Sequence, residues 1–186
     1  MAKGKLFVIS GASGVGKSTV LKMVMNARKD LIFSVSATTR PPRPEEQDGV
    51  HYYFVTQDQF QTMIREDAFL EYDVHAMNYY GTPKAQLEEK LSRGIAILDV
   101  EPAGAKIVRE KRPDAVLIFI MPPSREELER RLCGRGDTSQ EQIQIRMDRA
   151  QWEMDQRTWY DHVVVNDQVE TCANKILEII AQVADE

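Results

Sequence analysis

The sequence predicts an α/β protein: a parallel sheet flanked by helices, with a phosphate-binding P-loop after the first strand. Strand-length apolar runs alternate along the chain with stretches of helical apolar spacing, a pattern that favours a parallel sheet covered on both faces. A glycine-rich turn, Gly11–Gly16, follows the first run and leads directly into a helical stretch. The four runs are Lys5–Ser10, Ile95–Val100, Ala115–Ile120 and His162–Val165.

Two segments depart from this alternation and are predicted to be excursions from the core. Residues 34–83 are rich in Tyr, Arg, Pro and Gly, with a short strand expected at Tyr52–Val55 and a short helix after it. Residues 124–157 are predicted to form two charged helices joined at Gly134–Gly136. The expected helix starts carry capping-box pairs, Thr56 with Gln59, Ser124 with Glu127, and Ser139 with Gln142. Residues 1–33, 84–123 and 158–186 form the core of a single domain, residues 1–186.

The composition excludes several classes of protein. A chain of 186 residues with 42% hydrophobic and 28% charged residues is typical of a globular domain. The net charge of −5 argues against a nucleic-acid binder. No apolar run approaches the roughly 20 residues of a membrane span, and the N-terminus leads straight into a strand, so we expect a cytoplasmic protein without a signal peptide. Cys133 and Cys172 lie far apart, and both are expected to be inert core thiols. No obligate protein partner is evident.

The first glycine-rich turn matches the G-x-x-x-x-G-K-[ST] pattern in full, between a strand and a helix. Its backbone N–H groups and the helix N-terminus favour phosphate oxygens. We expect Lys17 to reach the β- and γ-phosphates of a nucleoside triphosphate, and the Ser18 hydroxyl to ligate Mg²⁺. The loop comprises Gly11, Ala12, Ser13, Gly14, Val15, Gly16, Lys17 and Ser18.

An acidic group at the end of a later strand is the candidate partner for that metal ion. Asp99 ends the apolar run Ile95–Val100, where a carboxylate can hold Mg²⁺ through its water shell. Glu101 follows two residues on. The alternative is that these two carboxylates cap a helix or serve a structural purpose.

The first excursion carries a candidate site for a second phosphate. Arg40 and Arg43 stand three apart in a proline-stiffened loop, and guanidinium forks bind phosphate in bidentate fashion. Tyr52 and Tyr80 can donate phenolic hydrogen bonds to the same phosphate. The alternative is a solvated basic turn with core aromatics.

Several motifs in one order make the chain resemble the guanylate kinases, which are ATP:GMP phosphotransferases. They are the G-x-S-G-x-G-K-S-T loop, S-x-T-T-R-x-P-R, G-x-x-Y-x-F, N-Y-Y-G-T-P, P-P-S…R-L-x-G-R-G and V-N-D. The resemblance implies that Ser36, Glu71 and Thr82 recognise guanine and that Arg40, Arg43, Tyr52 and Tyr80 hold the GMP phosphate. Gly81, Asp99, Glu101 and Arg146 are expected on the same GMP side.

The resemblance also implies an ATP side and a lid. Thr19, Arg131, Arg135 and Asn166 join the loop residues around ATP, with Asn166 against the adenine. Lys17, Arg43, Arg135 and Arg146 are the expected catalytic residues. Arg131 and Arg135 share a helix face, although neighbouring glutamates can pair with such arginines on a solvated face. The excursions are expected to close over the substrates and exclude water.

Guanine recognition by a carboxylate makes physical sense. Guanine presents N1–H and an exocyclic amino group as adjacent donors, and an ionised Glu71 can accept both. The Ser36 and Thr82 hydroxyls can donate to O6 or N7 or accept from the amino group. Adenine inverts this pattern, so AMP leaves Glu71 unpaired. We expect GMP and dGMP as acceptors.

Four positions differ from the family pattern: Glu101, Ala103, Met77 and Asp73. The family usually has D-[VI]-D-x-Q-G, whereas this chain has Asp99-Val100-Glu101-Pro102-Ala103-Gly104, and Pro102 suits the first turn of a helix. Met77 stands where a glycine is common, and Asp73 where a small residue is common. All four are expected near the guanine pocket.

Two alternative functions remain at this stage. Another small-molecule kinase of the same fold has no use for Ser36, Glu71 and Thr82. A non-catalytic guanylate-kinase-like module that binds phosphopeptides is expected to lose the loop lysine or the lid arginines, and this chain keeps both.

Overall fold

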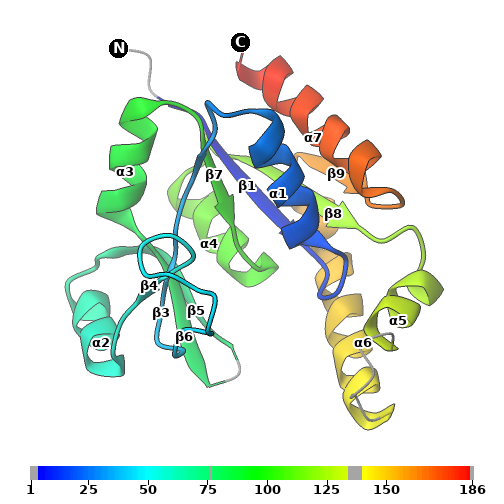
Figure 1. Cartoon of the computed structure of the whole chain (residues 1–186), viewed down its shortest axis with the longest axis horizontal. Coiled ribbons are helices and arrows are strands. Elements are labelled where there is room, and N and C mark those ends of the chain that lie inside the picture. The colour runs from blue at the N-terminus through cyan, green and yellow to red at the C-terminus, as the bar shows by residue number, and fades with distance from the viewer. Residues whose placement is uncertain (1–3, 76, 134–139, 185–186) are drawn as a thin grey trace. The chain divides into compact units, whose positions relative to one another are not determined.

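The computed structural model describes residues 4–75, 77–133 and 140–184 (Figure 1). The chain divides into two compact units. The first comprises Met1–Leu6 and Asp30–Ala115, and the second Phe7–Lys29 and Val116–Glu186. The excursion at 34–83 thus belongs to the first unit and the one at 124–157 to the second. The predicted division into a core, a GMP-binding part and a lid stays a prediction.

All four predicted core strands are present, with bounds that agree to within one residue. They are β1 (Leu6–Gly11), β7 (Ala96–Asp99), β8 (Val116–Met121) and β9 (His162–Val165). With β2 (Ile32–Phe33) they form a five-stranded sheet in the order β2-β7-β1-β8-β9. The pairings of β1 with β8, β2 with β7, and β8 with β9 are parallel, which confirms the predicted sheet class.

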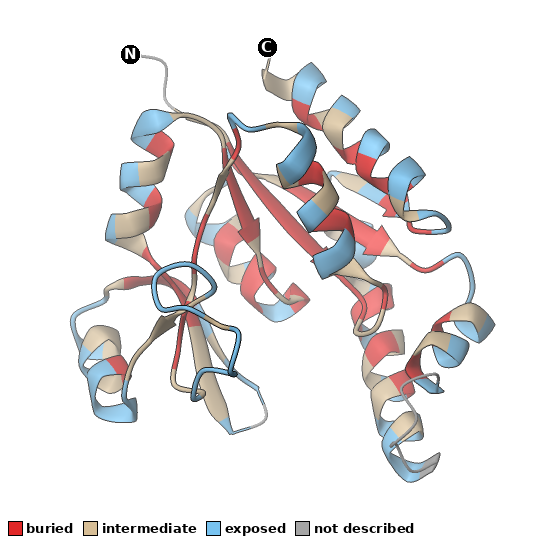
Figure 2. Ribbon diagram, in the orientation of Figure 1, coloured by how far each residue is buried: buried red, intermediate tan, exposed pale blue. Residues whose placement is uncertain are grey.

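In the second unit, β1, β8 and β9 carry the hydrophobic core. Ile9 pairs with Ile118, and Ile118 with His162 on the next strand. Residues 7–9 of β1 and 117–120 of β8 are completely buried (Figure 2), because a parallel sheet is covered on both faces. The helices α1 (Lys17–Ala27) and α7 (Val169–Ala184) pack against each other.

The buried face of helix α7 follows the apolar periodicity of its sequence. Cys172, Ile176 and Ile180 recur every four residues and are buried. Burial raises the pKa of the Cys172 thiol to about 11, as expected for an inert core thiol. The same expectation is wrong for Cys133, which is exposed at the end of its helix, because it points to a different side of α5 (Arg125–Cys133) from the buried Leu132.

The second excursion forms two helices, α5 and α6 (Gln140–Asp155), followed by the 3₁₀ turn η1 (Gln156–Trp159). Ser124 Oγ accepts the Glu127 N–H at 3.1 Å, as one half of the predicted capping box requires. The Glu127 carboxylate bonds instead to Arg130 and Arg131. The predicted junction at 134–136, and Ser139 of the second capping pair, lie outside the described residues.

In the first unit, a second sheet carries the first excursion. Its strand order is β4-β3-β6-β5, where β3 is Ala37–Thr38, β4 is Tyr53–Phe54, β5 is Phe69–His75 and β6 is Asn78–Pro83. Helix α2 (Gln57–Arg65) begins with the predicted capping box, since Thr56 and Gln59 exchange hydrogen bonds of 3.2 and 2.7 Å. Phe60 of this helix stacks on Phe69, with ring centroids 4.3 Å apart.

Two further helices complete this unit, α3 (Lys84–Arg93) and α4 (Pro102–Lys111). Pro102 occupies the first turn of α4, as expected, and α4 packs against β5. The hairpin of β5 and β6 is not predicted by alternation, because three successive residues of β5, Phe69 to Glu71, are all buried. Within the described part of the chain, no helix is long and apolar enough to cross a membrane.

Candidate functional site

The glycine-rich loop lies between β1 and α1, in the context that the sequence predicts. Gly14 and Gly16 have φ values of 85° and 93°, which residues with a Cβ rarely adopt. A Cβ at Gly14 would also lie 2.5 Å from the Leu132 side chain. The two glycines therefore allow the chain to bend and to pass close to α5.

Two predicted ATP residues contact this loop through its backbone. Asn166, just after β9, donates from Nδ2 to the Val15 carbonyl oxygen at 2.8 Å, and its side chain is buried. Arg131 of α5 donates to the carbonyl oxygens of Val15 and Asn166 at 3.2 Å and to Glu127 at 2.8 Å. Both residues thus lie at the loop, with the Asn166 side chain directed at the backbone. An adenine contact for Asn166 stays a prediction.

A residue that the sequence analysis missed contacts the loop from helix α6. Glu153 accepts the Ser13 N–H at 2.7 Å with Oε2, and the Arg149 Nε at 2.8 Å with Oε1. Its side chain is completely buried. The available signal was a glutamate among the buried residues Met147, Ala150 and Met154 of the same helix.

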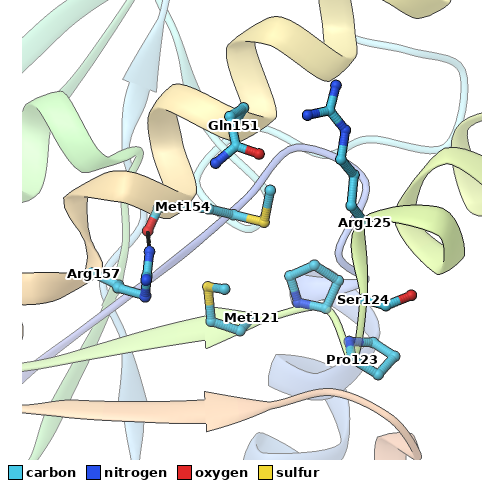
Figure 3. A pocket seen from close by; sticks show the side chains of 8 residues that line it. Met121, Pro123, Ser124, Arg125, Gln151, Met154 and Arg157 are labelled. Carbon is cyan, nitrogen blue, oxygen red and sulfur yellow. Dashed lines mark hydrogen bonds between the residues drawn. The ribbon is translucent and has the colours of Figure 1, made fainter.

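The other predicted residues of this unit are placed as follows. Lys17 and Arg146 are partly exposed, on α1 and α6, and Ser18 and Thr19 are exposed in the first turn of α1. Arg135 lies outside the described residues. A cavity of about 270 Å³ lies between the end of β8 and α6 (Figure 3), and none of the predicted site residues that the structure describes lines it. At its rim, Arg157 donates to the Met154 carbonyl oxygen at 2.9 Å.

In the first unit, the two arginines predicted to bind phosphate meet an internal carboxylate. Arg40 pairs in bidentate fashion with Glu46, at 2.9 and 2.8 Å, and Glu46 also accepts the Arg43 N–H at 2.8 Å. These hydrogen bonds lower the pKa of Glu46 to about 2. Glu46, six residues after Arg40, was not among the site residues predicted from the sequence.

Aromatic rings complete this phosphate-binding candidate. The Arg40 guanidinium lies 5.4 Å from the Tyr52 ring centroid and 5.8 Å from that of Phe54. Tyr80 packs edge-on against Tyr52, with centroids 6.0 Å apart. The structure therefore brings Arg40, Tyr52 and Tyr80 together. Next to them a cavity of about 450 Å³ is lined by Arg43, Pro44, Glu45, Glu46 and His51.

The predicted guanine-binding residues Glu71 and Thr82 meet across the β5–β6 hairpin. Thr82 Oγ1 donates to Glu71 Oε1 at 2.5 Å, and both side chains are buried. Gly104 of α4 lies close to them, since a Cβ there would be 2.7 Å from Glu71 Oε2. This close approach explains the glycine at position 104, a contact that the sequence analysis did not identify.

The environment of Glu71 determines how readily its carboxyl ionises. Burial raises the pKa of Glu71, and the nearby Asp73 carboxylate adds to this rise, while hydrogen bonds from Thr82 and the charge of Lys111 oppose it; the resulting pKa is about 7. Burial therefore disfavours the ionised form of the Glu71 carboxyl.

The remaining GMP-side residues of the first unit lie in or beside the second sheet, or between β7 and α4. Ser36 precedes β3 and is partly exposed, while its carbonyl oxygen accepts the Tyr53 N–H at 2.9 Å. Gly81 is buried, and a Cβ there would lie 2.9 Å from the Phe69 ring. Asp99 ends β7, and Glu101 is the N-cap residue of α4 without a side-chain capping bond.

The expectation that Met77 lies near the guanine pocket is wrong. Met77 is 96% exposed at the far end of the hairpin, where His75 pairs with Asn78. Thr82 lies five residues further along, roughly 16 Å away in an extended strand. The φ of 64° at Met77 explains why a glycine suits this position.

The parallel sheet, the strand–loop–helix and the G-x-x-x-x-G-K-S pattern define the class: an α/β protein with a P-loop for nucleotide phosphates. The family model described as guanylate kinase matches residues 3–183. The chain belongs to the guanylate kinase family.

Individual relatives agree along nearly the whole chain. A guanylate kinase of Thermus thermophilus is 50% identical over 179 residues, which cover 96% of this chain and 81% of the relative. That of Pasteurella multocida is 48% identical over 171 residues, or 90% of this chain and 82% of the relative. The crystal structure of guanylate kinase from Anaplasma phagocytophilum matches with a TM-score of 0.81 at 30% identity, covering 100% of this chain and 88% of that one.

Proposed function

We propose that the glycine-rich loop binds ATP and the Glu71–Thr82 pocket binds GMP in the guanylate kinase reaction. This chain, as a member of that family, transfers the γ-phosphate of ATP to GMP and yields ADP and GDP. A phosphate loop alone says nothing about the acceptor. The observation that carries the GMP assignment is the buried Glu71 carboxyl, which presents an acceptor beside Thr82 and Gly104.

In this assignment guanine recognition depends on the ionised carboxylate of Glu71. Its oxygens accept the N1–H and the amino group of guanine, and these donors stabilise the charged form that burial disfavours. Adenine offers no such pair of donors, so binding AMP leaves a buried charge uncompensated. Because neither Glu71 nor Thr82 addresses the ribose 2′-hydroxyl in this scheme, dGMP is a second acceptor.

The phosphate of GMP is assigned to the loop that holds Arg40, Arg43, Tyr52 and Tyr80. Glu46 holds the Arg40 fork in one orientation before any ligand arrives. Such preorganisation lowers the entropy that the arginine loses on binding phosphate. Arg43 is exposed and lines the adjacent cavity, which suits a direct contact with the anion.

The transfer itself requires positioning and charge stabilisation. An anionic oxygen of GMP attacks the γ-phosphorus in line, the bond from this phosphorus to the bridging oxygen breaks, and the electron pair leaves with ADP. No general base is needed, because the attacking oxygen carries no proton. Lys17, Arg43, Arg135 and Arg146 are assigned to the developing charge.

Magnesium fits the oxygen donors assigned to it. Ser18 offers a hydroxyl in the first turn of α1, and Asp99 a carboxylate at the end of β7, both hard ligands that Mg²⁺ prefers. We assign Ser18 to direct contact and Asp99 to contact through water. When bound, the ion neutralises phosphate charge during transfer.

Both alternative functions are less well supported. Family membership over residues 3–183 favours the enzyme over another small-molecule kinase of the same fold. Against a phosphopeptide-binding module, the chain keeps Lys17 and the complete loop.

A coupled ADP-release assay with GMP, dGMP, AMP, CMP and UMP tests the assignment. We expect turnover with GMP and dGMP; turnover with another monophosphate but none with GMP contradicts it. Lys17→Met should lower turnover at least about a hundredfold without loss of helical circular dichroism, since it removes charge next to the transferred group. Lys22→Met, an exposed lysine of the same helix, is the control and should be active.

A further inference from the structure

Helix α6 carries a carboxylate on its buried face. Met147, Ala150 and Met154 are spaced three and four residues apart and are buried together. Glu153 lies among them with 0% exposure. A leucine or methionine at this position would avoid the cost of burying a charge, so the contacts of Glu153 need an explanation beyond packing.

The two contacts of this carboxylate link distant parts of the chain. Oε2 accepts the Ser13 N–H of the glycine-rich loop at 2.7 Å, across 140 residues of sequence. Oε1 accepts the Arg149 Nε at 2.8 Å, one helical turn earlier. Hydrogen bonds to an ionised carboxylate are roughly twice as strong as those between neutral groups. Glu153 therefore joins helix α6 to the loop.

The same helix carries a residue assigned to the transferred phosphate. Arg146 precedes Glu153 by seven residues, which places the two on one face of α6, with their Cα atoms separated by a rise of about 10 Å. If Glu153 holds the helix at Ser13, the position of Arg146 relative to the loop follows from that contact.

We propose that Glu153 is a positioning residue for ATP, which ties α6 and its Arg146 to the Ser13 N–H of the glycine-rich loop. The proposal rests on the proposed function of this loop as the ATP site. Loss of the tie leaves the loop and Arg146 less well placed for the polyphosphate. In this proposal Arg146 acts on the transferred phosphate and not on the binding of GMP, so the effect falls on ATP and on transfer, while Glu71, Thr82 and the Arg40 loop have no part in it.

Steady-state kinetics of Glu153→Gln test this. The amide keeps the shape of the side chain but cannot accept from both Ser13 and Arg149. We expect the KM for ATP to rise and kcat to fall by about tenfold each, as for loss of a charge-assisted hydrogen bond, with the KM for GMP unchanged. The control is Asp148→Asn on the same helix, an exposed carboxylate that accepts from Gln144 at 2.7 Å. It should behave like the unaltered protein.

A second variant guards against a simple folding defect. Glu153→Met with Arg149→Met replaces the ion pair by apolar side chains of similar size, an exchange that buried pairs often tolerate. We expect this variant to fold, as judged by thermal unfolding, and to bind ADP more weakly in calorimetry than Arg149→Met alone.

The outcomes separate this proposal from the proposed function. If the unaltered protein does not phosphorylate GMP, the function fails, while calorimetry with ADP still tests Glu153. The proposal is overturned if folded variants bind ADP as the unaltered protein does, or if the KM values for ATP and GMP rise together. It is also overturned if neither variant folds, since Glu153 is then a purely structural residue.

Discussion

Glu71 in the first unit and Glu153 in the second are both buried carboxylates, but their partners differ. Glu153 faces a guanidinium, that of Arg149, and a backbone N–H, that of Ser13. Glu71 faces the Thr82 hydroxyl, and burial raises its pKa to about 7. One buried carboxyl meets a cation inside the protein, whereas the other meets a neutral donor.

This difference indicates which of the two carboxyls is suited to bind a ligand. The Glu153 carboxylate already accepts hydrogen bonds from a guanidinium and a backbone N–H, so it is suited to hold two parts of the fold together. A buried carboxyl next to a hydroxyl gains from any ligand that brings further donors, as guanine does. The raised pKa of Glu71 is therefore consistent with its proposed role in binding guanine, whereas the raised pKa of Cys172 reflects burial in the core alone.

The largest expected effect comes from removing the carboxyl that faces a neutral donor. Glu71→Gln replaces one acceptor by an amide donor that faces the donors of guanine. We expect kcat/KM for GMP to fall by about a hundredfold or more, the preference for GMP over AMP to narrow, and the KM for ATP to stay unchanged. The coupled assay measures all three values.

Asp58→Asn is the matched control, an exposed carboxylate in the first turn of α2 in the same unit. It should leave both KM values as they are. An equal rise in the KM values for ATP and GMP in Glu71→Gln would show that the carboxyl does not belong to the guanine pocket.

The next effect is on stability as a function of pH. Since the pKa of Glu71 rises from 4.5 to about 7 on folding, the folded state binds more protons than the unfolded state between these values. The free energy of unfolding therefore falls as pH rises through this window, by about 3 kcal/mol in total. Urea unfolding at a series of pH values, compared with Glu71→Gln, isolates this contribution.

We expect Glu71→Gln to lack this fall. As pH rises from 4.5 to 7, the unaltered protein should therefore lose stability relative to the variant. Parallel pH curves for both proteins would mean that Glu71 titrates normally in the fold. Saturating GMP should reduce the fall, because guanine binds the ionised form.

The smallest expected effect is at Met77, at the exposed end of the hairpin that carries Glu71. Met77→Gly relieves a left-handed backbone conformation with φ of 64° at a 96% exposed position. We expect the free energy of unfolding to rise by about 1 kcal/mol and the KM for GMP to stay unchanged. Urea unfolding measures the first value and the coupled assay the second. A changed KM for GMP would show that Met77 contributes to the GMP pocket.

Local chemistry made much of this fold predictable. The P-loop, the capping box at Thr56 and the buried strands follow from neighbouring residues, which is why their bounds agree with the structure. Residues chosen by resemblance, such as Glu71 and Thr82, are found in contact. Their roles toward substrates stay predictions.

Contacts between distant residues were not predictable in this way. Gly104 and Glu153 have ordinary sequence neighbours, and the role of each depends on a partner that folding brings near. The raised pKa of Glu71 was not predictable for the same reason, because desolvation depends on everything packed around the carboxyl.

Sequence patterns were sufficient to predict the sheet class, the phosphate loop and the family, because backbone geometry and motif chemistry are local. Folding brings the Glu153 carboxyl next to Arg149 and the Glu71 carboxyl next to the Thr82 hydroxyl, and no sequence pattern indicated this difference. Only the second arrangement gains from a ligand that brings further donors. The reason is physical: charge compensation depends on the distance between groups in space, which separation along the chain does not set.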